Sequence, residues 1–475
     1  MAAPRQIAVL DVGKTNVKVA VVDRPGRREI AVETTPNIVR RDGPYPHYDV
    51  AHLWAFFEDA ITRLARVHAI DGISITAHGA SIVLLGDDEL ALPVLDYEYD
   101  GPYALTSEYN ALRPDFAETQ SPRLPGGLTV GAQIHWLEHS FPDGFARTRF
   151  ILTYPQYWAW RLTGIATNEV TSLGCHTDLW QPAARTWSSL VEKTGWGRLM
   201  APVHDATVPL GPLKQALARR WGLADDMPVA CGIHDSNASL LPHLLDHTPP
   251  FTVVSTGTWA ISFAVGATAQ RLDPDRDTLA NVNVFGDPVP SARFMGGREF
   301  ELMTEDAPVP IDASAIDRVL EQGIMVLPAV LPESGPFQGR TARWSHDPST
   351  LSPALRTAAA GLYLACMTQT CRRARSGDRR RAVRRERPLL QRLGLVDRAG
   401  RAGFDGQCHR HQRRGCAVVR GSGRDGRQEP AAAIRGRARR RAGRGGGALC
   451  GALAGSGRRS LRRVRLRRSR HSARR

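Results

Sequence analysis

The chain has 475 residues, which is enough for two or three domains, and its formal net charge is +16. That charge is unevenly distributed. Residues 371–475 contain 34 arginines, no lysine and six acidic residues, a net charge of +28, so residues 1–370 carry a net charge of −12. The main body is therefore expected to be an acidic globular protein, which argues against nucleic-acid binding by the body.

The remaining composition indicates a soluble, cytoplasmic protein. No apolar segment reaches the roughly 20 residues of a membrane span, and the first residues lack a signal-peptide core. The seven cysteines are scattered and include no C-x-x-C pair. This pattern argues for a reducing compartment and against a disulfide framework or a zinc site.

The first predicted elements are two strands, at residues 6–10 and 17–22, which form a hairpin. Backbone N–H groups of a glycine-containing turn can face phosphate oxygens, and lysine can offset their charge. An aspartate here can hold Mg²⁺, directly or through water. The turn and its flanks therefore predict a nucleotide phosphate site, with an ordinary polar hairpin as the alternative. Its candidate residues are Asp11, Gly13, Lys14, Thr15, Asn16 and Lys18.

Strands and helices alternate through the next part of the chain, which indicates an α/β domain with helices covering a mixed sheet. Apolar residues at helical spacing predict a helix at 52–67. Strands are expected at 72–76 and 82–85, with His78 and Gly79 between them. A loop-rich region, 101–127, precedes a helix around 132–138. A lone histidine such as His78 is either structural or part of a binding site.

Asp235 follows a predicted strand at 229–233, and a helix is expected at 238–245, which Ser236 or Asn237 can cap. A carboxylate at a strand end is a natural general base, because the sheet fixes it at a site. The alternative is a helix cap or a simple loop residue.

A further strand at 251–255 ends in a small-residue turn, Thr256, Gly257 and Thr258. We expect a domain boundary near residues 249–250. The second domain should include a helix at 352–370.

Three features follow one another along the chain: an Asp-x-Gly hairpin, an Asp at the end of a strand in mid-chain, and a strand that ends in a Thr-Gly-Thr turn. Together they resemble the FGGY family of carbohydrate kinases. The likeness extends over residues 6 to about 370 and is to the rhamnulokinase/fuculokinase-like branch. It implies an α/β fold with two actin-like (ribonuclease H-like) domains around a cleft. Residues 1–249 would bind the sugar, and 250–370 would begin an incomplete ATP-binding domain.

The resemblance also implies the roles of the candidate residues. Asp235 would be the general base in ATP- and Mg²⁺-dependent phosphorylation of a ketose. L-Rhamnulose or L-fuculose is the first expectation and a pentulose the next. The first hairpin and the Thr256–Thr258 turn would bind ATP phosphates, and Asp11 would hold Mg²⁺. The sugar site would contain His78, Gly79, His234 and Ser236. Lys14, Asn16 and His78 depart from the usual family residues, which leaves the sugar open.

The Arg-rich segment 371–475 does not resemble the family and has one aromatic residue, Phe404. It is predicted to be disordered. High-GC coding sequence read out of frame gives Arg, Gly and Ala, so we expect a frameshift between residues 366 and 384. The genetic code allows codons for residues 407–420 that, when translated one base later, encode Ser-Ala-Thr-Gly-Thr-Ser-Glu-Gly-Ala-Ala. This shifted sequence resembles the adenine-side loop of the family.

The sequence leads to three hypotheses about function. The first is an active sugar kinase, and the second is a catalytically dead frameshift product of one. The third is nucleic-acid binding through the basic tail, since arginines bind phosphate backbones without specificity. In the preferred hypothesis, the protein binds a small-molecule sugar and neither a specific nucleic acid nor a membrane. The oligomeric state is left open, with a homodimer as one alternative.

Overall fold

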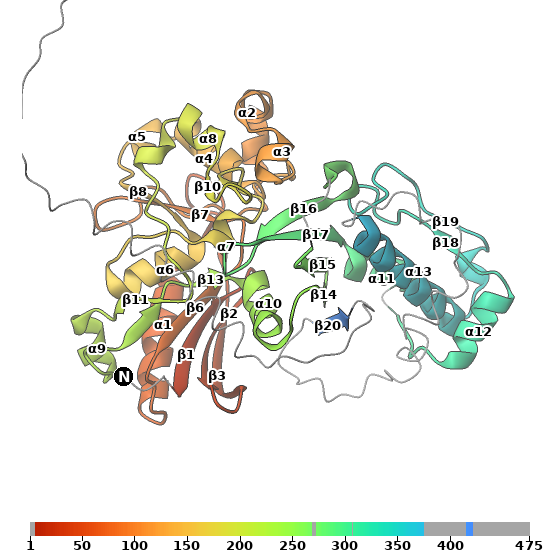
Figure 1. Ribbon diagram of the computed structural model, residues 1–475, viewed down its shortest axis with the longest axis horizontal. Helices are drawn as coiled ribbons and strands as arrows, with labels where there is room; N and C mark the ends of the chain where they lie inside the picture. Colours follow the sequence, from red (N-terminus) through yellow and green to blue (C-terminus); the bar gives the residue numbers. More distant parts are fainter. Residues whose placement is uncertain (1–4, 268–271, 306, 375–414, 421–475) are drawn as a thin grey trace, which may run out of the picture. The chain divides into compact units, whose positions relative to one another are not determined.

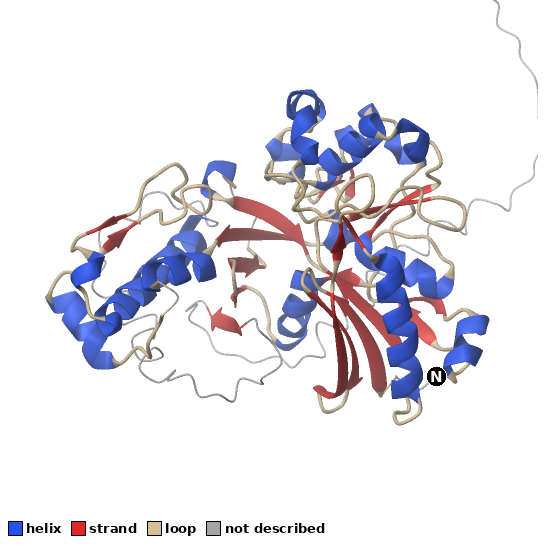
Figure 2. Ribbon diagram, turned by 180° about the vertical axis from the view of Figure 1, so that it is seen from behind, coloured by secondary structure: helices blue, strands red, loops and turns tan. Residues whose placement is uncertain are grey.

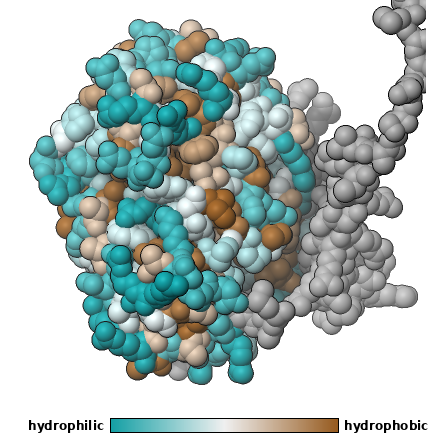
Figure 3. Space-filling model, turned by 90° about the vertical axis from the view of Figure 1, so that its left-hand side faces the viewer, coloured by the Kyte–Doolittle hydropathy of each residue, from teal (hydrophilic) through white to brown (hydrophobic). Residues whose placement is uncertain are grey.

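The computed structural model describes residues 5–267, 272–305, 307–374 and 415–420. The chain divides into two compact units, Met1–Arg424 and Asp425–Arg475, and the second lies wholly outside the described residues. Within the described residues, no helix is long and apolar enough to cross a membrane. The face drawn in Figure 3 carries mostly hydrophilic side chains with hydrophobic ones interspersed.

A seven-stranded mixed sheet forms the first part of the molecule (Figure 1). Its strand order is β11-β12-β6-β1-β2-β3, and β13 also pairs with β6. The strands are β1 (Gln6–Val12), β2 (Asn16–Asp23), β3 (Arg28–Pro36), β6 (Ile73–Ala77), β11 (Pro209–Pro212), β12 (Pro228–Ala230) and β13 (Ile233–His234). β1 and β13 each run parallel to β6. Their carboxyl ends therefore meet at one edge of the sheet.

Three helices pack against this sheet (Figure 2) and share one apolar core with it. They are α1 (Val50–Ala65), α6 (Tyr154–Thr163) and α9 (Gln215–Trp221). α1 begins where the Asp49 carboxylate accepts the His52 N–H at 3.0 Å, which satisfies a free donor of the first turn. Its buried face, which includes Leu53, Phe57 and Ile61, follows the helical period. The periodicity thus fixes which side of α1 faces the core.

A second apolar core lies under the segments between β6 and β11. Strands β7 (Ile82–Leu85) and β8 (Phe150–Thr153) pair antiparallel there. The helices are α2 (Thr106–Leu112), α3 (Phe116–Thr119), α4 (Val130–Ser140), α5 (Pro142–Phe145), α7 (Val170–Leu173) and α8 (Ser189–Lys193). The remaining strands are β4 (Val39–Arg40), β5 (His47–Tyr48), β9 (Trp180–Gln181) and β10 (Thr186–Trp187). Short helices therefore interrupt the region that was expected to be loop.

A five-stranded antiparallel sheet follows helix α10 (Asp235–Asp246), with strand order β16-β17-β15-β14-β20. Its strands are β14 (Phe251–Thr256), β15 (Ala260–Val265), β16 (Thr278–Val282), β17 (Pro288–Phe294) and β20 (Gly415–Arg420). Helix α13 (Pro353–Ala374) contacts β15 and β17, and it also packs on α11 (Gly296–Thr304) and α12 (Ala313–Glu321). A two-stranded ribbon joins β18 (Val326–Leu327) to β19 (Arg343–Trp344).

The structure confirms the predicted strands and helices and corrects several details. The expected strand 229–233 is broken into β12 and β13, because Gly232 adopts a φ of +84° between them. The predicted caps Ser236 and Asn237 are wrong. His234, at φ −63° and ψ 138°, is the N-cap of α10 and makes no side-chain cap bond. Both predicted caps therefore lie inside the first turn.

The expected tail begins inside α13, which continues four residues beyond 370 to Ala374. Residues 415–420 form β20, which pairs antiparallel with β14. The rest of the predicted disordered tail, 375–414 and 421–475, lies outside the described residues. The shifted-frame segment 407–420 therefore lies only partly within them.

Candidate active site

Three strand ends build the site. The hairpin with Gly13 and Lys14 follows β1, His78 follows β6, and Asp235 follows β13. Val12 pairs with Ala77, and Ala77 pairs with His234, so these positions stand side by side in the sheet. The His78 N–H also donates to the Val12 carbonyl at 2.9 Å. Because carboxyl ends of parallel strands meet at one edge, the predicted base and sugar residues are brought together.

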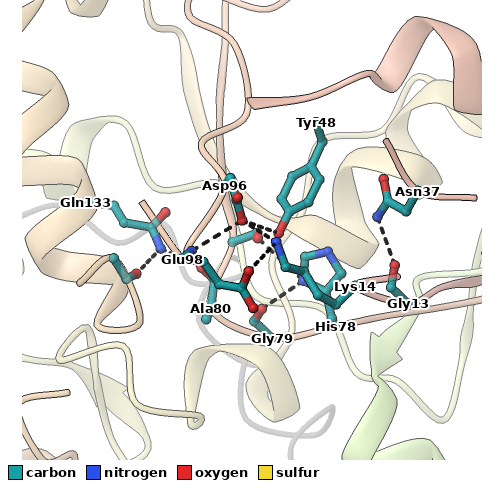
Figure 4. Close-up of polar contacts among 12 residues, drawn as sticks. Gly13, Lys14, Asn37, Tyr48, His78, Gly79, Ala80, Asp96, Glu98 and Gln133 are labelled. Carbon is teal, nitrogen blue, oxygen red and sulfur yellow. Dashed lines mark hydrogen bonds and ion pairs between the residues drawn. The ribbon is translucent and has the colours of Figure 1, made fainter. Parts of the chain in front are cut away.

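The first hairpin is held tightly at its tip. The Gly13 N–H donates to the Asn16 carbonyl at 3.1 Å, and a Cβ at Gly13 would lie 2.8 Å from that oxygen. The Asn37 amide Nδ2 donates to the Gly13 carbonyl at 2.8 Å (Figure 4). The Asn37 N–H donates to the Thr15 carbonyl at 2.9 Å. A tip with a small residue and a fixed backbone suits close approach by a ligand.

The two lysines of the hairpin are both in ion pairs. Lys18 Nζ lies 3.4 Å from an Asp11 oxygen and 3.1 Å from a Glu29 oxygen. Burial lowers the pKa of Lys18, but the two carboxylates outweigh it, and the net shift is upward. Lys14 contacts the carboxylates of Asp96 and Glu98 (Figure 4). Phosphate binding by either lysine stays a prediction.

The second small-residue turn joins β14 to β15. Thr256 and Thr258 are exposed. The Gly297 N–H, at the start of α11, donates to the Thr258 carbonyl at 3.2 Å. A Cβ at Gly297 would lie only 2.3 Å from the Gly257 carbonyl oxygen. The turn therefore requires glycine at 297, because any larger residue would displace its backbone.

His78 lies buried among tyrosine rings. Its ring centroid is 5.1 Å from that of Tyr48, 5.4 Å from that of Tyr97 and 4.9 Å from that of Tyr154. Burial lowers the pKa of His78 to about 4, so the imidazole is neutral at physiological pH. Nδ1 lies 3.0 Å from the Gly79 carbonyl, whereas buried Nε2 has no hydrogen-bond partner within the described residues.

Asp235 is the first residue of α10, with a side chain 20 % exposed. His234 Nε2 lies 3.2 Å from its Oδ1, and the Ser236 hydroxyl donates to the same oxygen at 3.2 Å. Burial lowers the pKa of His234, but the neighbouring Cys175 sulfur and the Asp235 carboxylate outweigh it and raise this pKa to about 9. A Cβ at Gly79 would lie 2.8 Å from His234 Nε2, so Gly79 leaves room for this imidazole.

Buried polar side chains fix the turn that presents Asp235. The His234 N–H donates to the Thr171 hydroxyl oxygen at 3.0 Å, and that hydroxyl donates to Glu169. The Gln156 amide donates to the carbonyls of Cys231 at 2.9 Å and Gly232 at 2.8 Å. Burial raises the pKa of Glu169 to about 7. These bonds hold the strand end rigidly.

The sequence analysis missed several residues of this site: Tyr48, Asp96, Tyr97, Glu98, Glu169, Thr171 and Cys175. The run Asp96-Tyr97-Glu98-Tyr99-Asp100 gives one signal, because acidic and aromatic residues alternate there in a loop. The others had no signal in spacing alone, since their side chains meet only after folding.

Within the described residues, no group of three or more His, Cys, Asp or Glu side chains could hold a metal ion. Mg²⁺ usually keeps several waters and binds through one or two carboxylates plus substrate phosphates. Asp11 lies near the end of β1, in an ion pair with Lys18, and its contact with Mg²⁺ stays a prediction.

Comparisons with known proteins agree with this architecture. The N-terminal domain of the FGGY family of carbohydrate kinases matches residues 6–242, and the C-terminal domain of carbohydrate kinase FGGY matches residues 248–384. A carbohydrate kinase from Novosphingobium aromaticivorans has a similar crystal structure. The TM-score is 0.73 and the identity 39 %, covering 78 % of this chain and 83 % of that one.

Two curated relatives are more distant. An L-fuculokinase of Salmonella typhi is 26 % identical over 265 residues, which is 54 % of this chain and 55 % of the relative. An L-xylulose/3-keto-L-gulonate kinase of Escherichia coli (strain K12) is 24 % identical over 280 residues, 54 % of this chain and 53 % of the relative. The chain spans about half the length of the curated relatives it matches. The two domain matches and the structural likeness together show that the chain has a two-domain actin-like fold and belongs to the FGGY family of carbohydrate kinases.

Proposed function

We propose that this protein is an ATP-dependent carbohydrate kinase that phosphorylates a hydroxyl of a ketose, with Asp235 as general base. L-Fuculose and L-rhamnulose are the first candidate substrates, and a pentulose such as L-xylulose is the next. The family membership and the names of the two curated relatives support this assignment.

The observation that carries the proposal is the position of Asp235. Its carboxylate stands at the end of β13, partly exposed, on the sheet edge where β1 and β6 also end. Burial lowers the pKa of His78, and the charge of Asp235 is one of the smaller influences that raise it, which supports a position of the predicted sugar residue near the predicted base. A base must reach the proton that it removes, so this proximity is what the chemistry requires.

In the proposed reaction, a sugar hydroxyl attacks the γ-phosphorus of ATP and Asp235 accepts the hydroxyl proton. The bond between the γ-phosphorus and the bridging oxygen breaks, and ADP leaves. His234 Nε2 lies 3.2 Å from one oxygen of the Asp235 carboxylate and so orients the side chain. The hairpin at Gly13 and the turn at Thr256–Thr258 bind phosphate oxygens through backbone N–H groups and hydroxyls. Mg²⁺ supplies charge neutralisation on the phosphates when it is bound with ATP.

The direct test measures ATP-dependent phosphorylation across a panel of ketoses. Asp235→Asn should lower kcat about 10²- to 10⁴-fold, the usual contribution of a general base. Sugar affinity, measured calorimetrically, should change little, because the amide keeps the shape of the side chain. Asp317→Asn, at an exposed position of α12, is the matched control and should leave kcat unchanged. Full turnover by Asp235→Asn would refute its role as base.

The second candidate is a catalytically inactive product of a shifted reading frame. It is favoured by the change from a net charge of −12 before residue 371 to +28 after it. In that case the protein has the sugar site but phosphorylates none of the ketoses tested. Sugar binding without turnover, in the chain as printed, separates this candidate from the first.

A further inference from the structure

A lysine side chain leaves the predicted phosphate hairpin and enters the region around His78 (Figure 4). Lys14 Nζ contacts the Asp96 carboxylate and lies 3.3 Å from a Glu98 oxygen. It also lies 5.2 Å from the ring centroid of Tyr48 and 5.0 Å from that of Tyr97, which are favourable distances for a cation over an aromatic ring. Both rings also surround His78, so the ammonium group belongs to the sugar side of the site.

Asp96 is the centre of this arrangement, with a side chain only 7 % exposed. Its Oδ1 accepts hydrogen bonds from Lys14, from the Tyr48 hydroxyl at 3.3 Å and from the Glu98 N–H at 3.2 Å. A buried carboxylate is retained where it is paired and hydrogen-bonded. Lys14 therefore orients the Asp96 side chain inside the site.

The local charge is negative despite the lysine. Two carboxylates, Asp96 and Glu98, share the single ammonium group of Lys14. His78 adds no charge, because burial lowers its pKa to about 4. The excess negative charge of Asp96 and Glu98 would repel a ligand that carries a carboxylate.

The hydrogen-bonding character points in the same direction. The Gly79 carbonyl can only accept, so the Nδ1 of His78 that lies 3.0 Å from it carries the proton. Its buried Nε2, which lacks a partner within the described residues, is then an acceptor. This acceptor suits a hydroxyl donor of the sugar and disfavours a carboxylate group at the same position, because a carboxylate has no proton to donate.

We propose that Lys14, Asp96 and Glu98 form a specificity-determining ion cluster that selects neutral polyhydroxy ketoses and rejects keto-acids. This inference rests on the proposed kinase function and deepens it by naming the substrate class. Lys14 acts by neutralising and orienting Asp96, and its ammonium group is kept from the substrate by the two carboxylates.

The test compares L-xylulose with 3-keto-L-gulonate, a neutral and a carboxylate-bearing substrate. The wild-type chain should have at least a tenfold higher kcat/KM for L-xylulose. Asp96→Asn combined with Glu98→Gln frees the ammonium group and should shift that ratio at least tenfold towards the acid. Glu301→Gln, an exposed member of an ion pair on α11, is the matched control and should leave the ratio unchanged.

A wild-type preference for the acid, or an unchanged ratio in the double variant, would overturn the proposal. Thermal-shift titration with each sugar in the absence of ATP gives the same comparison without turnover. If no sugar is phosphorylated but L-xylulose still binds more tightly than the acid, the kinase function fails and the specificity proposal stands. If the double variant does not fold, Glu98→Gln alone, at a side chain 66 % exposed, should shift the ratio in the same direction.

Discussion

At the scale of single residues, His234 connects the proposed base to the protein interior. Its Nε2 lies between Asp235 Oδ1, at 3.2 Å, and the Cys175 sulfur, at 4.0 Å. The imidazole is almost fully buried, so its position is fixed by packing. We infer that it positions the carboxylate, and its direct contact with the sugar stays a prediction.

Replacing His234 tests this positioning role. His234→Ala should lower kcat about tenfold or more while changing sugar affinity less, because only the orientation of Asp235 is lost. His234→Gln supplies an N–H donor at the same place and should recover part of the loss. Steady-state kinetics with ATP and the best ketose measures both. Equal losses in the two variants would show a purely structural role.

Glu169 predicts a pH dependence of stability. Burial raises the pKa of this carboxyl from 4.5 to about 7 in the folded protein, so the unfolded state releases the proton first. The stabilisation from the neutral carboxyl is complete below pH 4.5 and is lost as the pH rises to 7. At about 1.4 kcal/mol per pKa unit, the free energy of unfolding falls by up to about 3 kcal/mol.

Urea unfolding of the wild type and Glu169→Gln at pH 5 and pH 8 measures this loss. The glutamine side chain cannot ionise, so the wild type should lose stability relative to the variant between the two pH values. Glu301→Gln, an exposed replacement of the same kind, should show no such difference. A constant gap between wild type and Glu169→Gln would contradict the pKa shift.

The sequence identified Asp235 and His78 because a polar residue after an apolar strand has a fixed place at the sheet edge. It did not predict where Lys14 points. A lysine has four side-chain torsions, and the partner that decides them, Asp96, is 82 positions away. Long-range ion pairs of this kind follow from the fold and leave no periodic signal in the sequence.

At the scale of elements, the turn between β14 and β15 is shaped by the first residues of α11. Gly297→Ala would place a Cβ 2.3 Å from the Gly257 carbonyl oxygen and 3.1 Å from the Thr258 Cα. All of these contacts are with backbone, so the turn must move. We expect a severalfold increase in the KM for ATP with little change in the KM for the ketose.

The matched control is Gly197→Ala, where the nearest atom to a new Cβ is Val191 Cγ1 at 3.8 Å. This is ordinary van der Waals contact, so neither KM should change. Thermal unfolding of both variants checks that each remains folded. An unchanged KM for ATP in folded Gly297→Ala would remove the Thr256–Thr258 turn from the nucleotide site.

The sequence predicted helices and strands correctly where a single physical cause determines each element. The apolar period defines α1, and the β-type runs define β1, β2, β7 and β14. The prediction failed at the junction of β13 and α10. There the left-handed Gly232 interrupts the strand, and the helix begins directly after His234. Hydrogen bonds with the side chains of Thr171 and Gln156 hold the backbone at that junction. Capping preferences alone therefore predict the wrong start for the helix.

At the scale of the whole molecule, the chain joins an acidic, densely packed body to an arginine-rich segment of opposite charge. The family match to the C-terminal domain ends at residue 384, within the interval where we expect the frame to change. In the described residues, the sheet of the second domain has β20 at one edge, from the Arg-rich segment, beside β14. β14 leads directly into the Thr256–Thr258 turn, so we expect the proposed nucleotide site to depend on the strand that pairs with β14.

Restoring the shifted frame between codons 366 and 384 tests this dependence. The restored chain contains the Thr-Gly-Thr-Ser-Glu-Gly-Ala-Ala loop, and we expect it to be monodisperse, to be stabilised thermally by ATP and to phosphorylate a ketose. The unrestored chain should aggregate more and show a smaller ATP-dependent shift in Tm, because the frameshift hypothesis implies that part of its ATP-binding domain is missing. It should also bind heparin in a salt-dependent manner through its net charge of +28. A synonymous recoding of the same codons is the control. Equal ATP stabilisation of the printed and restored chains would mean that the arginine-rich segment completes the nucleotide site, and the frameshift hypothesis would then be wrong.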